Sequence, residues 1–348
     1  MIDPDLHNTT EEHVEEANTF SFEEEERKSR FLLPGVPVVP QLAVALGILV
    51  LVFGVTYISD ARNLIKNNDE SGARANVATS GETDPVDPFA DISIQATSAY
   101  VWDMKSQRAL YNKNADEQLP LASVAKLMTA LLAYELLGDD AKVTIGADAI
   151  AQDGESGLLS GEQFSLRELI DLTLITSSND GAYALASAAG ASIEGGNYGT
   201  RSFVELMNIR TEEIGLSRTT FNNTTGLDIS ESEAGAHGSA RDVAFLMEYL
   251  IAEYPSVFEM TRERQAYIAN NFGLTHDAAN TNYQVGNIAG VLASKTGYTT
   301  LAGGNLVVAF DAGLNHPVIV AVLGSSYNGR FSDVTTLIEA AKAALNTQ

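Results

Sequence analysis

The sequence predicts a mixed α/β domain of the α+β type, with one antiparallel five-stranded sheet flanked by helices and an inserted helical subdomain. Two observations predict this fold class. Short apolar runs typical of strands lie at both ends of the region 91–348. Between them, the region 140–270 shows mostly helical patterns. Strands at both ends with helices between them suit a single sheet that helices cover.

The first elements are two strands, expected at 92–102 and 109–112, with the turn-like residues 105–107 between them. Pro120 then precedes a helix expected from about 122 to 137. The helical patterns of the inserted subdomain lie at 166–176, 182–189, 203–214 and 240–251.

Three apolar runs follow the helical region, at 290–295, 304–310 and 317–323. Residues 311–315 read Asp-Ala-Gly-Leu-Asn, a turn that predicts a hairpin of the last two runs. A final amphipathic helix is expected at 332–345. Its apolar face consists of Val334, Leu337, Ile338, Ala341 and Leu345.

The region before this domain differs in composition. Residues 1–30 are polar and acidic, which predicts a disordered tail, although such a tail could also bind a partner. Residues 36–58 are apolar and uncharged over roughly the 20 residues that span a bilayer as a helix. A buried core helix would not need such uniform apolarity. Residues 59–90 are rich in Gly, Ser, Asn, Asp and Pro, which predicts a linker.

A retained membrane anchor at 36–58 is favoured over a cleaved signal peptide. No small-x-small cleavage site follows closely, and the preceding tail is long and acidic. Arg27, Lys28 and Arg30 precede the segment, and Arg62 and Lys66 follow it. The slight excess of basic residues before the segment predicts a cytoplasmic N-terminus and an extracytoplasmic domain 91–348 in the cell membrane.

Composition excludes several function classes. The 348 residues carry a formal net charge of −25, which disfavours nucleic acid as a partner because phosphate binding needs clustered Lys and Arg. The absence of cysteine rules out a disulfide framework, a thiolate metal site and a cysteine nucleophile. There is no H-E-x-x-H motif and the five histidines are scattered, so neither a metal nor a cofactor is expected.

The first chemical motif is Ser123-x-x-Lys126, at the start of the helix expected at 122–137. Positions i and i+3 share a helix face, so the lysine amine can reach the serine hydroxyl. Lysine can act as the base that activates serine if burial or a nearby cation lowers its pKa. The spacing alone is weak, because roughly one chance match is expected in a chain of this length. A serine near a helix N-cap remains the simpler interpretation of this motif by itself.

The second motif is Ser177-Ser178-Asn179, at the end of the helix expected at 166–176. A second hydroxyl near the nucleophile can relay a proton to a leaving amine. A carboxamide can donate to and accept from a substrate amide at once. Taken alone, these residues are more simply explained as helix caps.

The third motif is Lys295-Thr296-Gly297, at the end of a predicted strand. A cation and a hydroxyl at this place can bind a substrate carboxylate. Glycine lets a peptide approach the strand backbone, which suits recognition by added-strand pairing. The alternative is an ordinary strand end followed by a turn.

In this order, the three motifs resemble those of class A β-lactamases and penicillin-binding proteins. The segments 119–130, 177–186, 221–228 and 239–242 are similar to the low-molecular-weight penicillin-binding proteins, the serine-type D-alanyl-D-alanine carboxypeptidases. The resemblance covers about residues 91–345 and implies the β-lactamase/transpeptidase-like fold. It also implies action on peptidoglycan stem peptides that end in D-Ala-D-Ala, and inhibition by β-lactam antibiotics.

The resemblance implies catalytic roles for three residues. Ser123 would attack the carbonyl of the penultimate D-Ala and form an acyl-enzyme. Lys126 would be the general base, and Ser177 would help to pass the proton to the leaving D-Ala. Lys295 would help to keep Lys126 neutral, because two nearby cations repel each other.

The resemblance also implies substrate-binding residues. Asn179 and the strand that contains Gly297 would hold the peptide, while Lys295 and Thr296 would bind the terminal carboxylate. The backbone N–H groups of Ser123 and Tyr298 would form the oxyanion hole. Arg330 would assist carboxylate binding.

Three alternatives stay open. An endopeptidase of the same family would cut cross-links instead of terminal residues. A β-lactamase would need a Glu–water pair for fast deacylation, and the sequence shows no convincing E-x-x-L-N between the second and third motifs. A catalytically dead wall-binding module is disfavoured by intact Ser123, Lys126 and Lys295.

The chain departs from the family in one respect. The sequence ends at Gln348, without the C-terminal β-rich domain common in the family.

Overall fold

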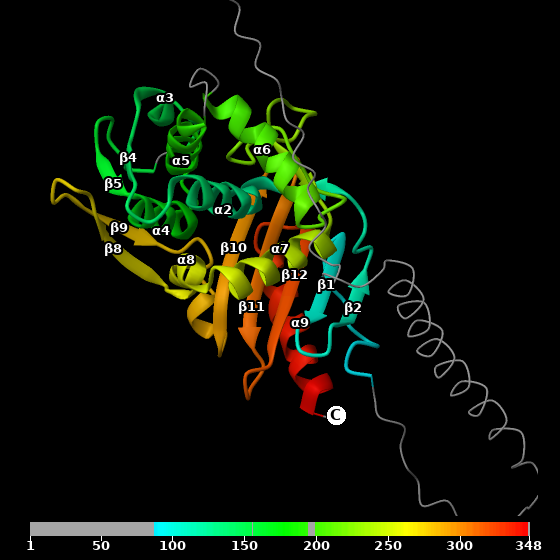
Figure 1. Cartoon of the computed structure of the whole chain (residues 1–348). Coiled ribbons are helices and arrows are strands. Elements are labelled where there is room, and N and C mark those ends of the chain that lie inside the picture. The colour runs from blue at the N-terminus through cyan, green and yellow to red at the C-terminus, as the bar shows by residue number, and fades with distance from the viewer. Residues whose placement is uncertain (1–86, 155, 194–198, 347–348) are drawn as a thin grey trace, which may run out of the picture. The chain divides into compact units, whose positions relative to one another are not determined.

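The computed structural model describes residues 87–346, apart from residue 155 and residues 194–198. An antiparallel five-stranded sheet forms its centre, in the order β10-β11-β12-β1-β2 (Figure 1). The strands are β1 (Ser98–Asp103), β2 (Arg108–Lys113), β10 (Val291–Thr299), β11 (Gly303–Asp311) and β12 (Pro317–Ser325). The predicted sheet and its hairpin across residues 311–315 are therefore confirmed.

Both faces of this sheet are covered by helices. Along β11, the side chains of Leu306, Val308 and Phe310 join the apolar cluster under α9 (Gly329–Asn346). Val307 and Ala309 point the other way, into the cluster that includes α7 (Ala240–Glu253). Because the central strands are buried on both faces, their sequences are continuous apolar runs instead of alternating patterns.

The helical subdomain lies between β2 and β10 in the chain, as predicted. Its main elements are the 3₁₀-helix η1 (Ala122–Ala125), α2 (Lys126–Leu137), α3 (Ala147–Ile150), α4 (Leu166–Thr176), α5 (Asn179–Ser192) and α6 (Gly199–Glu213). Beyond α7, the short elements α8 (Pro255–Phe258), η2 (Glu259–Arg262) and η3 (Val285–Asn287) lead back to the sheet. The second and fifth of the expected helices, 166–176 and 240–251, are confirmed almost to the residue.

The expectation that residues 140–270 are mostly helical was too simple, because short strands occur there as well. They are β4 (Lys142–Thr144), β5 (Gln163–Ser165), β6 (Thr220–Phe221), β7 (Ala236–Gly238) and β8 (Gln265–Ala269), with partners β3 (Leu119–Pro120) and β9 (Thr275–Ala279). Runs of two to five residues are too short to show a period in the sequence.

Several element boundaries differ from the predictions by a few residues. Residues 92–97 are not part of β1, because the N–H groups of Gln95 and Ala96 donate to the carboxylate of Asp333. The helix expected from 122 to 137 begins with the 3₁₀ turn η1, and α2 starts only at Lys126.

The predictions for the N-terminal region are not tested by this structure. The acidic tail 1–30, the membrane segment 36–58 and most of the linker 59–90 lie outside the described residues. Within the described part of the chain, no helix has the length and apolarity needed to cross a bilayer.

Candidate active site

Ser123 and Lys126 lie in direct contact at the junction of η1 and α2. The Lys126 Nζ atom is 2.8 Å from the Ser123 Oγ atom, as the i, i+3 spacing predicts. The preceding residue, Ala122, has a left-handed backbone with φ of 49°, an unusual conformation for a residue with a Cβ. This turn directs the serine hydroxyl toward the lysine.

The Lys126 amine is enclosed by acceptors and has no exposed surface. Besides Ser123, it lies 2.7 Å from Asn179 Oδ1 and 2.7 Å from the Thr225 carbonyl oxygen. Burial holds the pKa of Lys126 well below its ordinary value of 10.5, and the positive charge of Lys295 lowers it further. A neutral amine has a lone pair, so Lys126 can accept the proton of the Ser123 hydroxyl.

The second motif joins two helices, and each of its residues does something different. Ser177 ends α4 in the left-handed conformation, with φ of 62°. Ser178 is the N-cap of α5, and its hydroxyl accepts from the N–H of Gly181. The capping interpretation is therefore correct for Ser178. The hydroxyl of Ser177 does not cap a helix and contacts Lys295 instead.

Asn179 connects Lys126 to the loop after α3. Its Oδ1 atom accepts from Lys126, and its Nδ2 atom donates to the Asp153 carbonyl oxygen at 2.5 Å. Both ends of the carboxamide are engaged, so its orientation is fixed.

Lys295 lies on β10, with only 1% of its surface exposed. Its Nζ atom donates to Ser177 Oγ at 2.8 Å and to the Thr296 carbonyl oxygen at 2.9 Å. Burial, reinforced by the charge of Arg330, lowers the pKa of Lys295 to about 7. The second and third motifs are therefore in contact, through Ser177 and Lys295. The first and second motifs are in contact through Lys126 and Asn179.

The strand that carries the third motif is an edge strand of the five-stranded sheet. A Cβ on Gly297 would lie 2.7 Å from the Leu121 carbonyl oxygen and 3.3 Å from the Ser123 nitrogen, so only glycine allows this approach. The neighbouring Tyr298 is 51% exposed. Tyr298 follows Gly297, which closely approaches Ser123, so its position agrees with the predicted oxyanion hole. The oxyanion hole itself stays a prediction.

Arg330 contacts the backbone of β10 at the third motif. It is 3% exposed, and its Nη1 atom donates to the Gly297 carbonyl oxygen at 2.7 Å. The guanidinium also lies 4.5 Å from the ring centroid of Tyr327. The predicted role of Arg330 in binding a substrate carboxylate stays a prediction. Its hydrogen bond to β10 and its lowering of the Lys295 pKa are seen directly in the structure.

The third motif also contacts the segment before β10, because Thr296 Oγ1 lies 2.6 Å from Thr281 Oγ1.

The loop 222–228 is the part of the site that the motifs did not identify. The Thr225 carbonyl oxygen accepts from Lys126, and Asn223 Oδ1 accepts from the N–H of Gly226 at 2.7 Å. Gly226 has φ of +78°, and a Cβ there would lie 1.9 Å from the Ala122 carbonyl oxygen. Asp228 accepts from Thr299 Oγ1 at 2.8 Å, which ties the loop to the end of β10. In the sequence, this loop was indicated only by the resemblance of segment 221–228 to the family, which assigned no role to its residues.

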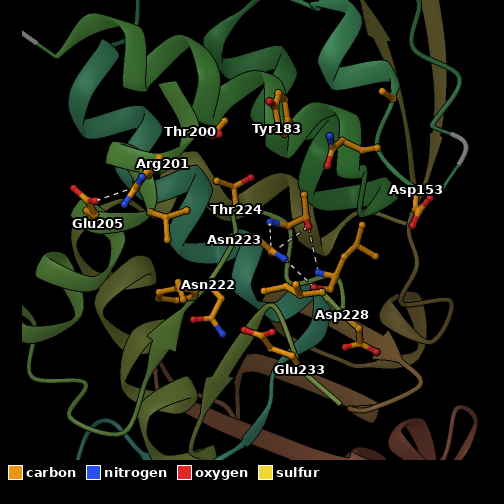
Figure 2. Close-up of a pocket in the computed structure, with 17 residues that line it drawn as sticks. Asp153, Tyr183, Thr200, Arg201, Glu205, Asn222, Asn223, Thr224, Asp228 and Glu233 are labelled. Atoms are coloured by element: carbon orange, nitrogen blue, oxygen red, sulfur yellow. Dashed lines mark hydrogen bonds and ion pairs between the residues drawn. The ribbon is translucent and has the colours of Figure 1, made fainter. Parts of the chain in front are cut away.

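A cavity of about 800 Å³ lies beside the residues of the first two motifs (Figure 2). Thr225 and Asp153 line it. The Thr225 carbonyl oxygen accepts a hydrogen bond from Lys126, and the Asp153 carbonyl oxygen accepts one from Asn179. Ser123 itself does not line the cavity, which therefore lies beside the candidate nucleophile. Among the described residues, no group of three or more acidic or histidine side chains could hold a metal ion.

Comparison with known proteins agrees with this geometry. The sequence model of the peptidase S11 family, described as D-alanyl-D-alanine carboxypeptidase, matches residues 82–327. The D-alanyl-D-alanine carboxypeptidase DacF of Bacillus subtilis is 30% identical over 264 residues, which are 74% of this chain and 65% of that protein. A D-alanyl-D-alanine endopeptidase of Pseudomonas aeruginosa is 27% identical over 75% of this chain and 83% of its own length.

The fold is also similar to solved structures. Penicillin-binding protein D2 of Listeria monocytogenes, in its ampicillin-bound form, aligns with a TM-score of 0.59 and 28% identity. That alignment covers 72% of this chain and 98% of the Listeria chain.

Proposed function

The chain belongs to the D-alanyl-D-alanine carboxypeptidase family of serine peptidases, and on this premise we propose that it removes the terminal D-Ala of peptidoglycan stem peptides. It spans less than two thirds of the length of the curated carboxypeptidases that it matches, 65% of DacF and 61% of the DacC of Escherichia coli. The proposal therefore depends on the chain's own site. The observation that carries it is the 2.8 Å contact of Ser123 with a buried lysine of lowered pKa.

The acylation step follows from this contact. The neutral Lys126 amine takes the Ser123 proton while the serine oxygen bonds to the carbonyl carbon of the penultimate D-Ala. The electron pair that moves to the carbonyl oxygen is stabilised by the backbone N–H groups of Ser123 and Tyr298. When this pair returns, the C–N bond breaks and the terminal D-Ala leaves.

The leaving amine needs a proton, and Ser177 is placed to relay one. Its hydroxyl, which accepts from Lys295, gives its proton to the amine and takes up the proton that Lys126 received from Ser123, so that Lys126 is neutral again. Before cleavage, Lys295 in its charged form and Thr296 hold the terminal carboxylate. Water then attacks the ester carbonyl, with Lys126 again as the base, and Ser123 is released. β-Lactams would acylate Ser123 in the same way and act as inhibitors.

A test of this proposal uses the wild-type chain and a synthetic pentapeptide that ends in D-Ala-D-Ala. Mass spectrometry should show the loss of one alanine residue from the peptide. In a parallel reaction with benzylpenicillin, the peptic fragment that contains Ser123 should gain the mass of the antibiotic. An intact pentapeptide together with an unmodified fragment would exclude the proposal.

Endopeptidase action is a second candidate, because this chain covers more of the Pseudomonas endopeptidase than of the curated carboxypeptidases. The same site would then cleave a D-Ala bond inside a cross-link. Defined cross-linked muropeptides separate the two activities. Conversion of dimers to monomers, with pentapeptide left intact, would favour this second candidate.

For localisation, we propose that residues 36–58 anchor the chain in the cell membrane as a single-pass helix, with the N-terminus in the cytoplasm. The apolar length and the basic residues before the segment support this placement. Alkaline carbonate should leave the full chain in the membrane pellet. A chain that begins at residue 87 should be released, and release of both would contradict the anchor.

A further inference from the structure

Thr296 of the third motif contacts a residue that lies outside all three motifs. Its Oγ1 atom is 2.6 Å from Oγ1 of Thr281, which belongs to the segment between β9 and η3. Thr296 is 4% exposed, and Thr281 is partly buried. The two hydroxyls are therefore in contact at the residue that, in the proposed function, binds the substrate carboxylate together with Lys295.

The segment that carries Thr281 is fixed to the elements on both sides of it. The Thr281 N–H donates to the Ile175 carbonyl oxygen near the end of α4, at 3.0 Å. The next residue, Asn282, has no exposed surface, and its Nδ2 atom donates to Ser294 Oγ on β10 at 3.1 Å. The backbone of Thr281 is thus held by contacts that do not involve its hydroxyl.

The two hydroxyls carry two protons but share one hydrogen bond. The structure gives each hydroxyl of Thr281 and Thr296 one hydrogen-bond partner, which is the other hydroxyl. Whichever oxygen donates, the second proton has no acceptor in the described part of the chain. A hydroxyl proton without an acceptor in such a buried place favours a ligand that supplies one, and a carboxylate is a strong acceptor.

The charge of that ligand determines which hydroxyl donates. If Thr296 donated to Thr281, Thr296 would present only lone pairs to a carboxylate, and the two would repel each other. If Thr281 donates to Thr296, the Thr296 proton is available to the carboxylate, and a hydroxyl that accepts one hydrogen bond donates another more strongly. Lys295 donates to Ser177 Oγ and to the backbone carbonyl of Thr296, so the Thr296 hydroxyl is oriented by Thr281.

We propose that Thr281 is a positioning residue, whose hydroxyl donates to Thr296 and so directs the Thr296 proton toward the carboxylate of the substrate's C-terminal residue. This inference rests on the proposed function, which supplies that carboxylate. It adds to the three motifs a residue on which the preference for a free terminal carboxylate depends.

The test compares two substrates that differ only in this carboxylate. They are the esters of Nα,Nε-diacetyl-Lys-D-Ala with D-lactate and with D-lactamide, which has a carboxamide in place of the carboxylate. The wild-type chain should show a higher kcat/KM for the lactate ester. Thr281→Val keeps the shape of the side chain without its hydroxyl. It should lower the ratio of the two kcat/KM values about tenfold, the size expected for a weakened hydrogen bond to a charged group.

The ratio separates positioning from a structural role. Damage to packing would lower both kcat/KM values together, so a Thr281→Val ratio equal to that of the wild type would overturn the proposal. Thr281→Ser restores the hydroxyl and should restore the ratio. Thr275→Val is the matched control, because Thr275 is exposed on β9, and it should keep the wild-type ratio. A ratio that falls equally in Thr275→Val would also contradict the proposal.

Failure of the inference can be distinguished from failure of the proposed function. If neither ester is cleaved, the proposed function is wrong, and binding still tests Thr281. Calorimetry on the Ser123→Ala variant then compares Nα,Nε-diacetyl-Lys-D-Ala-D-Ala with its C-terminal amide. The carboxylate form should bind more tightly, and adding Thr281→Val should remove most of the difference. A difference that Thr281→Val leaves unchanged, or no difference at all, would reject the role of Thr281, whatever the reaction.

Discussion

Replacing Ser123 with alanine is expected to abolish covalent labelling by a fluorescent penicillin and the release of D-Ala from a pentapeptide. The substitution removes the oxygen that would form the ester, and no neighbouring hydroxyl occupies its position. Ser177 is engaged with Lys295, and Ser178 caps α5. Labelling is measured on denaturing gels, where only a covalent adduct survives.

The fold of the Ser123→Ala variant should be retained, because Lys126 keeps its acceptors Asn179 and Thr225. The matched control is Ser178→Ala, which removes a nearby buried serine from the cap of α5. That variant should lose about 1 kcal/mol of stability and still be labelled. Labelling that persists in Ser123→Ala would identify a different nucleophile.

Replacing Lys126 with methionine is expected to slow acylation by roughly 10²–10⁴-fold, the range for loss of a general base. Methionine has a similar length and leaves no charge in a site without exposed surface, so the helix should still fold. The rate is measured as the time course of penicillin labelling in excess reagent. Lys142→Met, on the exposed surface of β4, should react like the wild type.

The pH dependence of acylation provides a second measurement on the same variant. A lysine is neutral above its pKa, so the wild-type rate should rise with pH as Lys126 loses its proton. Because the pKa of Lys126 is lowered well below 10.5, this rise should be complete before ordinary lysines titrate. In Lys126→Met the rising limb should be absent. A rise that survives the substitution would assign it to another group.

On the alkaline side, kcat/KM for the peptide should fall as Lys295 loses its charge. Its pKa of about 7 means that the free enzyme holds a cation there below that pH and a neutral amine above it. The terminal carboxylate loses its ionic partner when Lys295 is neutral. The two lysines therefore predict a bell-shaped profile, of which Lys126→Met should keep only the falling limb.

The sequence by itself predicted the order of the main elements and named candidates for the reacting groups. Continuous apolar runs predicted the strands, because a sheet buried on both faces needs apolar residues at every position. The spacing of Ser123 and Lys126 predicted their contact, since three residues make about one helical turn. The other two motifs were predicted through a family resemblance, because alone they were better explained as caps and turns.

Only the tertiary structure decided how these groups act on one another. The lowered pKa of Lys126 comes from burial and from Lys295, which is far away in the chain. The Thr225 carbonyl was not predictable as a partner of Lys126, because any residue can supply a backbone carbonyl. The resemblance included the segment 221–228, but what Gly226 accommodates, the Ala122 carbonyl, depends on a fold that brings the two segments together.

The cavity of about 800 Å³ beside Lys126 shows the same division between local sequence and tertiary structure. The residues that line it come from the segment after α3, from α5 and α6, and from β6 and the loop after it, and nothing in their local sequences relates them. Local sequence determines helices, strands and the chemistry of each side chain, because those depend on neighbours within a few residues. Burial, electrostatic fields and cavities depend on contacts between distant segments, and these exist only once the chain has folded.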